Sequence, residues 1–173
     1  MPKVIENLEI RMIAEAKRQV EEQGYGAVTI RSVAKGCGVG VGTVYNYFPS
    51  KDALLATFML ESWNVCMEKL QSVSEESAEP KPVLGCMYEQ LLQFAEEYRY
   101  IFSDEGAASA FAGSFGRYHA LLRSQLAAPM RKFCSDDFAA EFVAEAMLVW
   151  TMAGKPFDEI SGILAKILMS AVS

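Results

Sequence analysis

The stretch GVGVGTVYNYFPSKD, residues 38–52, decides the fold of this 173-residue chain. It predicts a tight turn at Gly38, a short helix that starts at residue 40 or 41, and a stop at Pro49. A new helix is expected directly afterwards, with Ser50 as its N-cap. The short helix has small residues at its start and aromatic residues at its end. That asymmetry indicates a helix whose N-terminus approaches another molecule.

Two further helices are expected on the N-terminal side of this stretch. Residues 7–23 carry apolar side chains at three- and four-residue spacing, which is typical of an amphipathic helix that ends at Gly24. Thr29 is the predicted N-cap of a second helix over residues 30–37. Two helices joined by a short glycine-containing turn form a helix-turn-helix, whose second helix enters the major groove of DNA.

The remainder of the chain also has only helical patterns. We expect a long helix over residues 51–73, a polar linker with two prolines over residues 74–82, and then further helices. These helices are predicted over residues 83–103, 115–127, 135–153 and 156–172. The predicted fold is therefore all-α, with an N-terminal three-helix helix-turn-helix domain (residues 1–50) and a C-terminal helical domain (residues 51–173).

Composition limits the possible functions. The net charge is −6, which argues against a broadly basic nucleic-acid binder. Residues 1–52 hold seven of the 16 Lys and Arg and six of the 22 Asp and Glu, so the acidity lies in the later part and a local DNA-binding face remains allowed. No apolar run approaches the ~18 residues of a transmembrane helix. We expect a cytoplasmic protein.

The residues that carry most catalytic and metal chemistry are scarce. The chain has one histidine and four widely spaced cysteines, so we expect no metal site, no cofactor and reduced thiols. Cys37 has two open interpretations, a packing role and a redox-sensing role. No catalytic constellation stands out, and an enzyme is not expected.

Residues 33–54, VAKGCGVGVGTVYNYFPSKDAL, resemble the signature of the tetracycline-repressor (TetR) family, roughly I-A-x-x-A-G-V-S-x-G-T-L-Y-x-Y-F-x-S-K-E-x-L. The preceding segment, with Gly24-Tyr25 and Val28-Thr29-Ile30-Arg31, fits the lead-in of that family. The chain departs from the signature at Gly40, where serine is usual, and at Cys37, where alanine is usual. Val41 is apolar where polar residues that read bases are common.

The resemblance implies DNA contacts of two kinds. Thr29, Tyr47 and Lys51 correspond to positions that contact phosphates and fix the register. Arg31 corresponds to a position that reaches bases, where arginine can grip guanine N7 and O6. The full set of implied DNA contacts is Thr29, Arg31, Val41, Gly42, Thr43, Tyr45, Asn46, Tyr47 and Lys51.

The resemblance also implies a C-terminal domain that binds a small molecule and forms a homodimer. Aromatic and methionine side chains are the candidate lining for an apolar or aromatic effector, with ordinary core packing as the alternative. The candidates are Met59, Trp63, Met67, Met87, Phe94, Tyr98, Phe102, Phe111, Phe115 and Tyr118. The last two helices are the expected dimer interface, because the first of them is apolar on nearly every side. The interface residues expected are Phe142, Ala146, Val149, Trp150, Ile160, Ile163, Leu164 and Ile167.

The expected function is that of a ligand-responsive, DNA-binding transcriptional regulator. It would bind a palindromic operator in double-stranded DNA as a homodimer and, as a repressor, be released by the small molecule. An activator is the open alternative for the direction of control. A helical protein-interaction module that has lost specific DNA binding is the alternative function.

Overall fold

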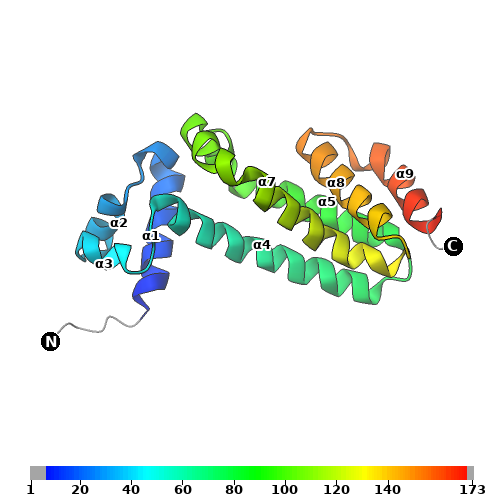
Figure 1. The fold of residues 1–173 in the computed structure, drawn as a ribbon, viewed down its shortest axis with the longest axis horizontal. Helices are drawn as coiled ribbons and strands as arrows, with labels where there is room; N and C mark the ends of the chain where they lie inside the picture. The colour runs from blue at the N-terminus through cyan, green and yellow to red at the C-terminus, as the bar shows by residue number, and fades with distance from the viewer. Residues whose placement is uncertain (1–6, 171–173) are drawn as a thin grey trace. The chain divides into compact units, whose positions relative to one another are not determined.

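The structure is a computed structural model that describes residues 7–170, except for the side chains of residues 108–118. All regular elements in this part of the chain are helices, which confirms the predicted all-α fold (Figure 1). None of them combines the length and the apolar character that crossing a bilayer requires.

The chain forms two compact units. The first comprises residues 1–62 and 98–113, and the second comprises residues 63–97 and 114–173. Helices α4 (Lys51–Glu76) and α7 (Glu105–Ala127) each contribute residues to both units. The predicted boundary between a DNA-binding domain (residues 1–50) and an effector-binding domain (residues 51–173) concerns function. The compact units are defined by contacts alone, so this boundary stays a prediction.

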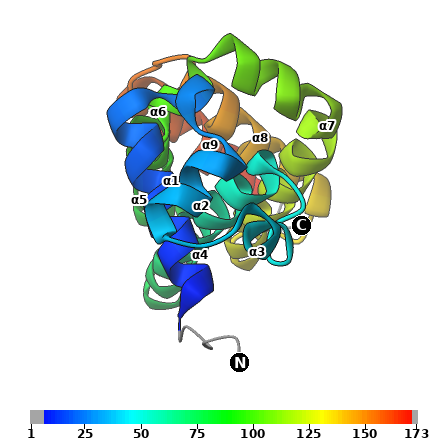
Figure 2. The same cartoon turned by 90° about the vertical axis from the view of Figure 1, so that its left-hand side faces the viewer.

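The first unit contains the helix-turn-helix. Its helices are α1 (Leu8–Gln23), the 3-10 turn η1 (Tyr25–Ala27), α2 (Ile30–Cys37), α3 (Val41–Tyr45) and α6 (Arg99–Phe102). Helix α1 packs against α2, and α2 packs against α3, as Figure 2 shows from the side of these helices. The side chains expected on the inner face of α1 are all buried; they are Leu8, Met12, Ala16 and Val20.

Local signals set the ends of these helices as predicted. Thr29 caps α2, because its hydroxyl accepts a hydrogen bond from the Ser32 amide. Gly38 ends α2 with a left-handed backbone (φ 69°), which costs glycine little. Ser50 Oγ accepts a hydrogen bond from the Ala53 amide (3.0 Å) at the start of α4.

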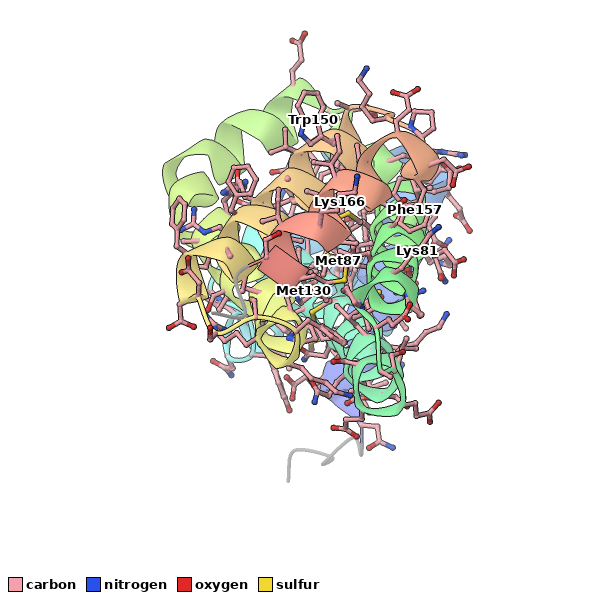
Figure 3. All side chains as sticks on the ribbon, turned by 90° about the vertical axis from the view of Figure 1, so that its right-hand side faces the viewer. Lys81, Met87, Met130, Trp150, Phe157 and Lys166 are labelled. Atoms are coloured by element: carbon pink, nitrogen blue, oxygen red, sulfur yellow. The ribbon has the colours of Figure 1, made fainter. Side chains whose placement is uncertain are left out.

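The second unit is built around α5 (Pro80–Glu97), which packs against α8 (Asp137–Met152) and α9 (Phe157–Ser170). The 3-10 turn η2 (Ala128–Lys132) leads from α7 toward α8. Met87 and Met130, labelled in Figure 3, are completely buried in the core of this unit. The core also takes the inward side chains of α8 and α9, such as Met147 and Leu168.

The linker predicted over residues 74–82 is wrong. Helix α4 continues to Glu76, and α5 begins at Pro80. Ser74 is buried, and its hydroxyl donates to the Pro129 carbonyl (3.0 Å). Lys132 Nζ donates to the carbonyls of Ser74 (2.6 Å), Glu75 (3.1 Å) and Ser77 (2.7 Å), at the end of α4 and just after it, where carbonyls have no partner within the helix. The prolines fit the first turn of α5, where no amide proton is needed.

Three other predicted boundaries differ. The helix expected over residues 83–103 is divided into α5 and α6, and Tyr98 lies between them. The helix expected from residue 115 starts at Glu105, because Asp104 Oδ1 accepts from the amides of Gly106 (2.8 Å) and Ala107 (3.0 Å). The helix expected from residue 135 is α8, which starts at Asp137 and is capped by Asp136; the Asp136 carboxylate accepts from the Phe138 amide (2.8 Å).

Candidate nucleic-acid interface

The N-terminus of α2 is held by a reciprocal pair of hydrogen bonds. Thr29 Oγ1 accepts from the Ser32 amide (3.0 Å), and Ser32 Oγ accepts from the Thr29 amide (2.9 Å). The Thr29 side chain is exposed, so the start of α2 is ordered and also open to a ligand. Amide groups at a helix N-terminus favour anions, which suits the predicted phosphate contact at Thr29.

A network of polar side chains connects the start of α2 to α1. Gln19 is only 5% exposed; its side chain lies 2.6 Å from Ser32 Oγ and donates to Glu15 Oε1 (2.7 Å). Glu15 also accepts from Arg18, and this hydrogen bond lowers the pKa of its carboxyl, with a further contribution from Gln19. A Cβ at Gly36 would lie 2.1 Å from Glu15 Oε1, so glycine here lets the carboxylate approach the backbone of α2.

Helix α3 and the three residues after it have a buried side and an exposed side. Val44 and Phe48 are buried, whereas Val41, Tyr45 and Tyr47 are exposed by 37%, 54% and 46%. Of the remaining predicted contacts, Arg31, Gly42 and Asn46 are exposed, and Thr43 is half-buried. The predicted base-reading residues of α2 and α3 therefore lie on accessible parts of the helix-turn-helix, which leaves their roles as predictions.

Gly40 and Gly42, at the start of α3, border space that no other part of the protein fills. A Cβ added at Gly42 would meet nothing within 4 Å, and one added at Gly40 would meet only Thr43 Oγ1 at 3.8 Å. Gly40 has an extended backbone (φ −72°, ψ 149°), and neither glycine has a positive φ. The protein itself therefore does not require glycine at either position, which is consistent with close approach of another molecule.

Lys51 does not extend freely from the first turn of α4. Its ammonium donates to the Tyr25 carbonyl (3.2 Å) and lies 3.6 Å from the centroid of the Tyr25 ring. The Tyr25 hydroxyl in turn donates to Asp52 Oδ1 (2.7 Å). Tyr25 precedes Lys51 by 26 residues, and sequence reasoning missed it; a tyrosine directly after the glycine that ends α1 was the available signal.

Cys37 packs between α2 and α1. It is 6% exposed, and Arg11 Nη2 donates to its carbonyl (3.1 Å). Burial raises the pKa of the Cys37 thiol, and the charge of Glu15 acts in the same direction. Both effects disfavour the reactive thiolate and favour the packing interpretation over redox sensing.

Three of the aromatic residues predicted to line a pocket have aromatic packing partners inside the protein; they are Trp63, Phe94 and Tyr98. Trp63 is 2% exposed; it meets Phe94 edge-to-face (5.3 Å between centroids), and its Nε1 donates to Gln125 Oε1 (2.7 Å). Tyr98, 3% exposed, stacks on Phe58 at 5.8 Å. Of the others, Met87 is buried, Met59 is half-buried and Phe102 is 48% exposed. The side chains of Phe111, Phe115 and Tyr118 lie outside the described residues.

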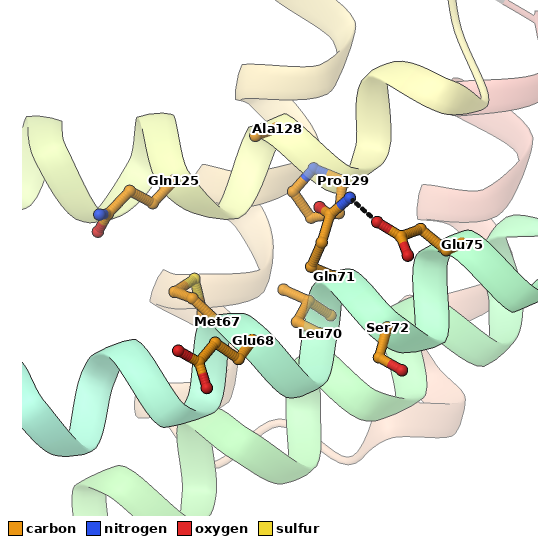
Figure 4. Close-up of a pocket in the computed structure, with 9 residues that line it drawn as sticks. All are labelled: Met67, Glu68, Leu70, Gln71, Ser72, Glu75, Gln125, Ala128 and Pro129. Carbon is orange, nitrogen blue, oxygen red and sulfur yellow. Dashed lines mark hydrogen bonds between the residues drawn. The ribbon is translucent and has the colours of Figure 1, made fainter.

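An open groove of about 470 Å³ lies beside Met67 in the second unit (Figure 4). Met67 and Leu70 supply apolar surface, and Glu68, Gln71 and Glu75 supply polar groups from the same face of α4. Across the groove lie Gln125, Ala128 and Pro129. Apart from Met67, these residues were not predicted, because the prediction considered aromatic and methionine side chains. The polar residues that recur at helical spacing along α4 were the available signal.

Helices α8 and α9 expose an apolar face. Phe142, Val149, Trp150 and Ile163 are 46–63% exposed, and Trp150 is labelled in Figure 3. Phe138, Met152 and Met169 are similarly exposed and were missed. The other predicted interface residues lie deeper: Ala146, Ile160 and Ile167 are half-buried against the core, and Leu164 is buried in it. A groove of about 670 Å³ runs along this face between Phe138, Phe142, Ile163 and Ile167.

Residues 12–57 match the sequence profile of the bacterial regulatory proteins of the tetR family. The uncharacterized HTH-type transcriptional regulator YerO of Bacillus subtilis is 34% identical over 76 residues, which cover 43% of this chain and 26% of YerO. The HTH-type transcriptional repressor KstR of Mycobacterium tuberculosis is 35% identical over 95 residues, which cover 50% of this chain and 43% of KstR. The chain thus spans less than half the length of these curated relatives.

The fold extends the similarity beyond the matched segment. The crystal structure of the TetR family repressor AlkX from Dietzia sp. superposes with a TM-score of 0.68 at 14% identity, covering 94% of this chain and 98% of AlkX. At this identity the likeness shows a shared fold. The segment matched by the family profile contains α2, the turn and α3, where the exposed residues of the helix-turn-helix lie. Residues 12–57, which contain α2, the turn and α3, are thus similar to the bacterial regulatory proteins of the tetR family.

Proposed function

We propose that this chain is a ligand-responsive transcriptional regulator that binds a palindromic operator as a homodimer. The observation that carries the proposal is the helix-turn-helix of residues 30–45, which has an ordered α2 N-terminus and an α3 with exposed side chains and an open N-terminal turn. A helix of this kind presents its first residues to base edges in the major groove. The match of residues 12–57 to the profile of the tetR family supports the same assignment.

The DNA contacts divide between base reading and backbone contacts. Arg31, Thr43 and Asn46 are the residues proposed to hydrogen-bond base edges, and Val41 is proposed to touch a thymine methyl. Thr29, Tyr47 and Lys51 are proposed to contact phosphates, and Tyr45 a base or sugar. Because this helix-turn-helix has few cations and α3 has none, specificity is proposed to depend strongly on Arg31.

A homodimer formed through α8 and α9 would place two copies of the helix-turn-helix on one duplex. The exposed aromatic and aliphatic residues of these helices support it, because monomers rarely leave such apolar patches uncovered. A two-fold dimer requires half-sites about 34–36 Å apart, or a multiple of that distance. The operator is therefore proposed to be palindromic.

A small molecule that binds the C-terminal helices is proposed to release the operator. Helix α4 is continuous from Lys51, beside the helix-turn-helix, to Glu76, beside the groove at Met67. A ligand that favours a different arrangement of α4 would weaken DNA binding, and by reciprocity DNA would weaken ligand binding. The repressors KstR and AlkX support repression as the direction of control.

Selection of bound sequences from a random duplex pool tests the proposal. The full chain, incubated at low salt, is expected to enrich a two-fold symmetric site, and affinity for that site should fall steeply with salt as counterions are released. Arg31→Ala should bind the selected site less specifically, whereas Lys35→Ala, another exposed cation of α2 outside the predicted contacts, serves as the matched control. A pool that stays random after repeated selection would refute DNA binding and favour a protein-interaction module.

A further inference from the structure

Tyr25, in η1, is buried and packs against the start of α4. The residue is 5% exposed, and its ring lies under the Lys51 ammonium, 3.6 Å from the centroid. Its carbonyl accepts a hydrogen bond from the same ammonium (3.2 Å). Its hydroxyl donates to Asp52 Oδ1 (2.7 Å). One residue thus contacts two consecutive side chains of the first turn of α4.

The same ring faces the first turn of α7. A Cβ placed on Gly106 would lie in van der Waals contact with Tyr25 Cε1 (3.7 Å) and would crowd Asp104 Oδ1 (3.0 Å), so this turn and the ring are direct neighbours. Asp104 ties the turn together by accepting from the Gly106 and Ala107 amides. Burial raises the pKa of the Tyr25 phenol, and the carboxylates of Asp52 and Asp104 reinforce the shift. All these residues belong to the first compact unit.

The contacts of Lys51 have a physical reason at this position. A cation in the first turn of a helix is disfavoured by the helix dipole. The face of an aromatic ring and a carbonyl oxygen are both electronegative, so Tyr25 compensates for this cost and confines the flexible lysine side chain. The ammonium is thus confined by Tyr25 on the side chain of the first residue of α4, where the proposed function has its phosphate contact.

We propose that Tyr25 is a positioning residue through which the first turn of α7 controls the contact of Lys51 with the DNA backbone. The inference rests on the proposed function and adds a residue that acts on DNA only through Lys51. A shift of the turn at Gly106 presses on the ring, and the ring carries the Lys51 ammonium with it. Because α7 continues into the second unit, its first turn is a point where a change in that unit can reach the DNA contact.

Double-mutant cycles on the selected operator test this coupling. Lys51→Met should reduce the salt dependence by about one phosphate contact. Tyr25→Leu, which removes the aromatic face, should weaken binding about three- to tenfold when Lys51 is present, as expected for a partly desolvated cation–π contact. The same substitution should have almost no effect in the Lys51→Met background. Tyr25→Phe keeps the ring and should restore most of the affinity lost in Tyr25→Leu.

Gly106→Val supplies the second cycle. Its side chain would crowd the Asp104 carboxylate and touch the Tyr25 ring, so the turn must shift beside the ring. We expect weaker operator binding in the wild-type background and no further loss in the Tyr25→Leu or Lys51→Met background. Equal fold-changes for Tyr25→Leu or for Gly106→Val with and without Lys51 would overturn the inference. Should Tyr25→Leu fail to fold by circular dichroism, the cycle of Gly106→Val with Lys51→Met decides alone. Absence of any operator for the wild-type chain would instead refute the proposed function.

Discussion

Replacing Trp150 by alanine is expected to weaken the proposed dimer strongly. Trp150 lies near the C-terminal end of α8 and keeps 46% of its surface exposed in the single chain. Burial of a large aromatic side chain covers about 150–250 Å², so about 100 Å² of Trp150 is left for a partner to cover. At about 25 cal/mol per Å² this area is worth about 2.5 kcal/mol for each side chain.

A two-fold homodimer has two copies of Trp150, so the upper limit for the lost free energy of dimerisation is about 5 kcal/mol. Alanine keeps some of the area, and ordering the interface has its own cost, so we expect about half of the limit. That corresponds to a dimer Kd about 100-fold higher for Trp150→Ala than for the wild type.

Sedimentation velocity over a range of protein concentrations measures the dimer Kd directly. Leu92→Ala is the matched control, because Leu92 is 42% exposed but lies on α5, outside the apolar face of α8 and α9. Its dimer Kd should stay within about threefold of the wild type, since scattered exposed apolar residues need no partner. An unchanged Kd for Trp150→Ala, or a wild-type chain that stays monomeric throughout, would refute the reasoning from exposed area.

Three further outcomes are expected. Arg31→Ala should relax base preference at one position of each half-site, by about 1–3 kcal/mol, in a repeated selection; an equal loss on every sequence would mean that Arg31 contacts only phosphate. Lys132→Met should lower the free energy of unfolding, measured in urea, by about 1–2 kcal/mol, because it leaves the carbonyls at the end of α4 without their charged donor. Lys81→Met is the control; Lys81 is an exposed residue of α5, and its substitution should change this free energy little. Burial raises the pKa of all four cysteine thiols, so alkylation at pH 8 should be slow in the native protein and fast in urea. Equal alkylation rates in the native and unfolded protein would contradict the raised thiol pKa. Because the folded state holds these thiol protons more tightly, their contribution to the free energy of unfolding is complete below the ordinary thiol pKa of about 9 and declines at higher pH.

The helix-turn-helix was predictable because its signals are local. The hydroxyl of Thr29, the left-handed backbone at Gly38 and the cap at Ser50 each act within three residues of their own position. The separation of buried and exposed side chains on α3 follows directly from helical periodicity. These features needed no knowledge of how distant segments meet.

The features that sequence missed depend on partners far along the chain. The end of α4 looked like a linker because Lys132, which caps it, lies more than 50 residues away. The contact of Lys51 with Tyr25 was missed because Tyr25 belongs to another element. The aromatic residues of the C-terminal part were read as a lining, yet composition does not distinguish Trp63 packed on Phe94 from Trp63 facing a ligand.

The open space at Gly40 and Gly42 bears on how this regulator can acquire new operators. A side chain at either position would meet almost nothing of the protein's own, and neither glycine has a positive φ that would strain a larger residue. Sequence drift here is therefore free of the folding constraint that holds Val44 or Phe48 in place. A library randomised at these two sites would sample DNA preference almost independently of stability, which makes the start of α3 the natural place to evolve or engineer specificity.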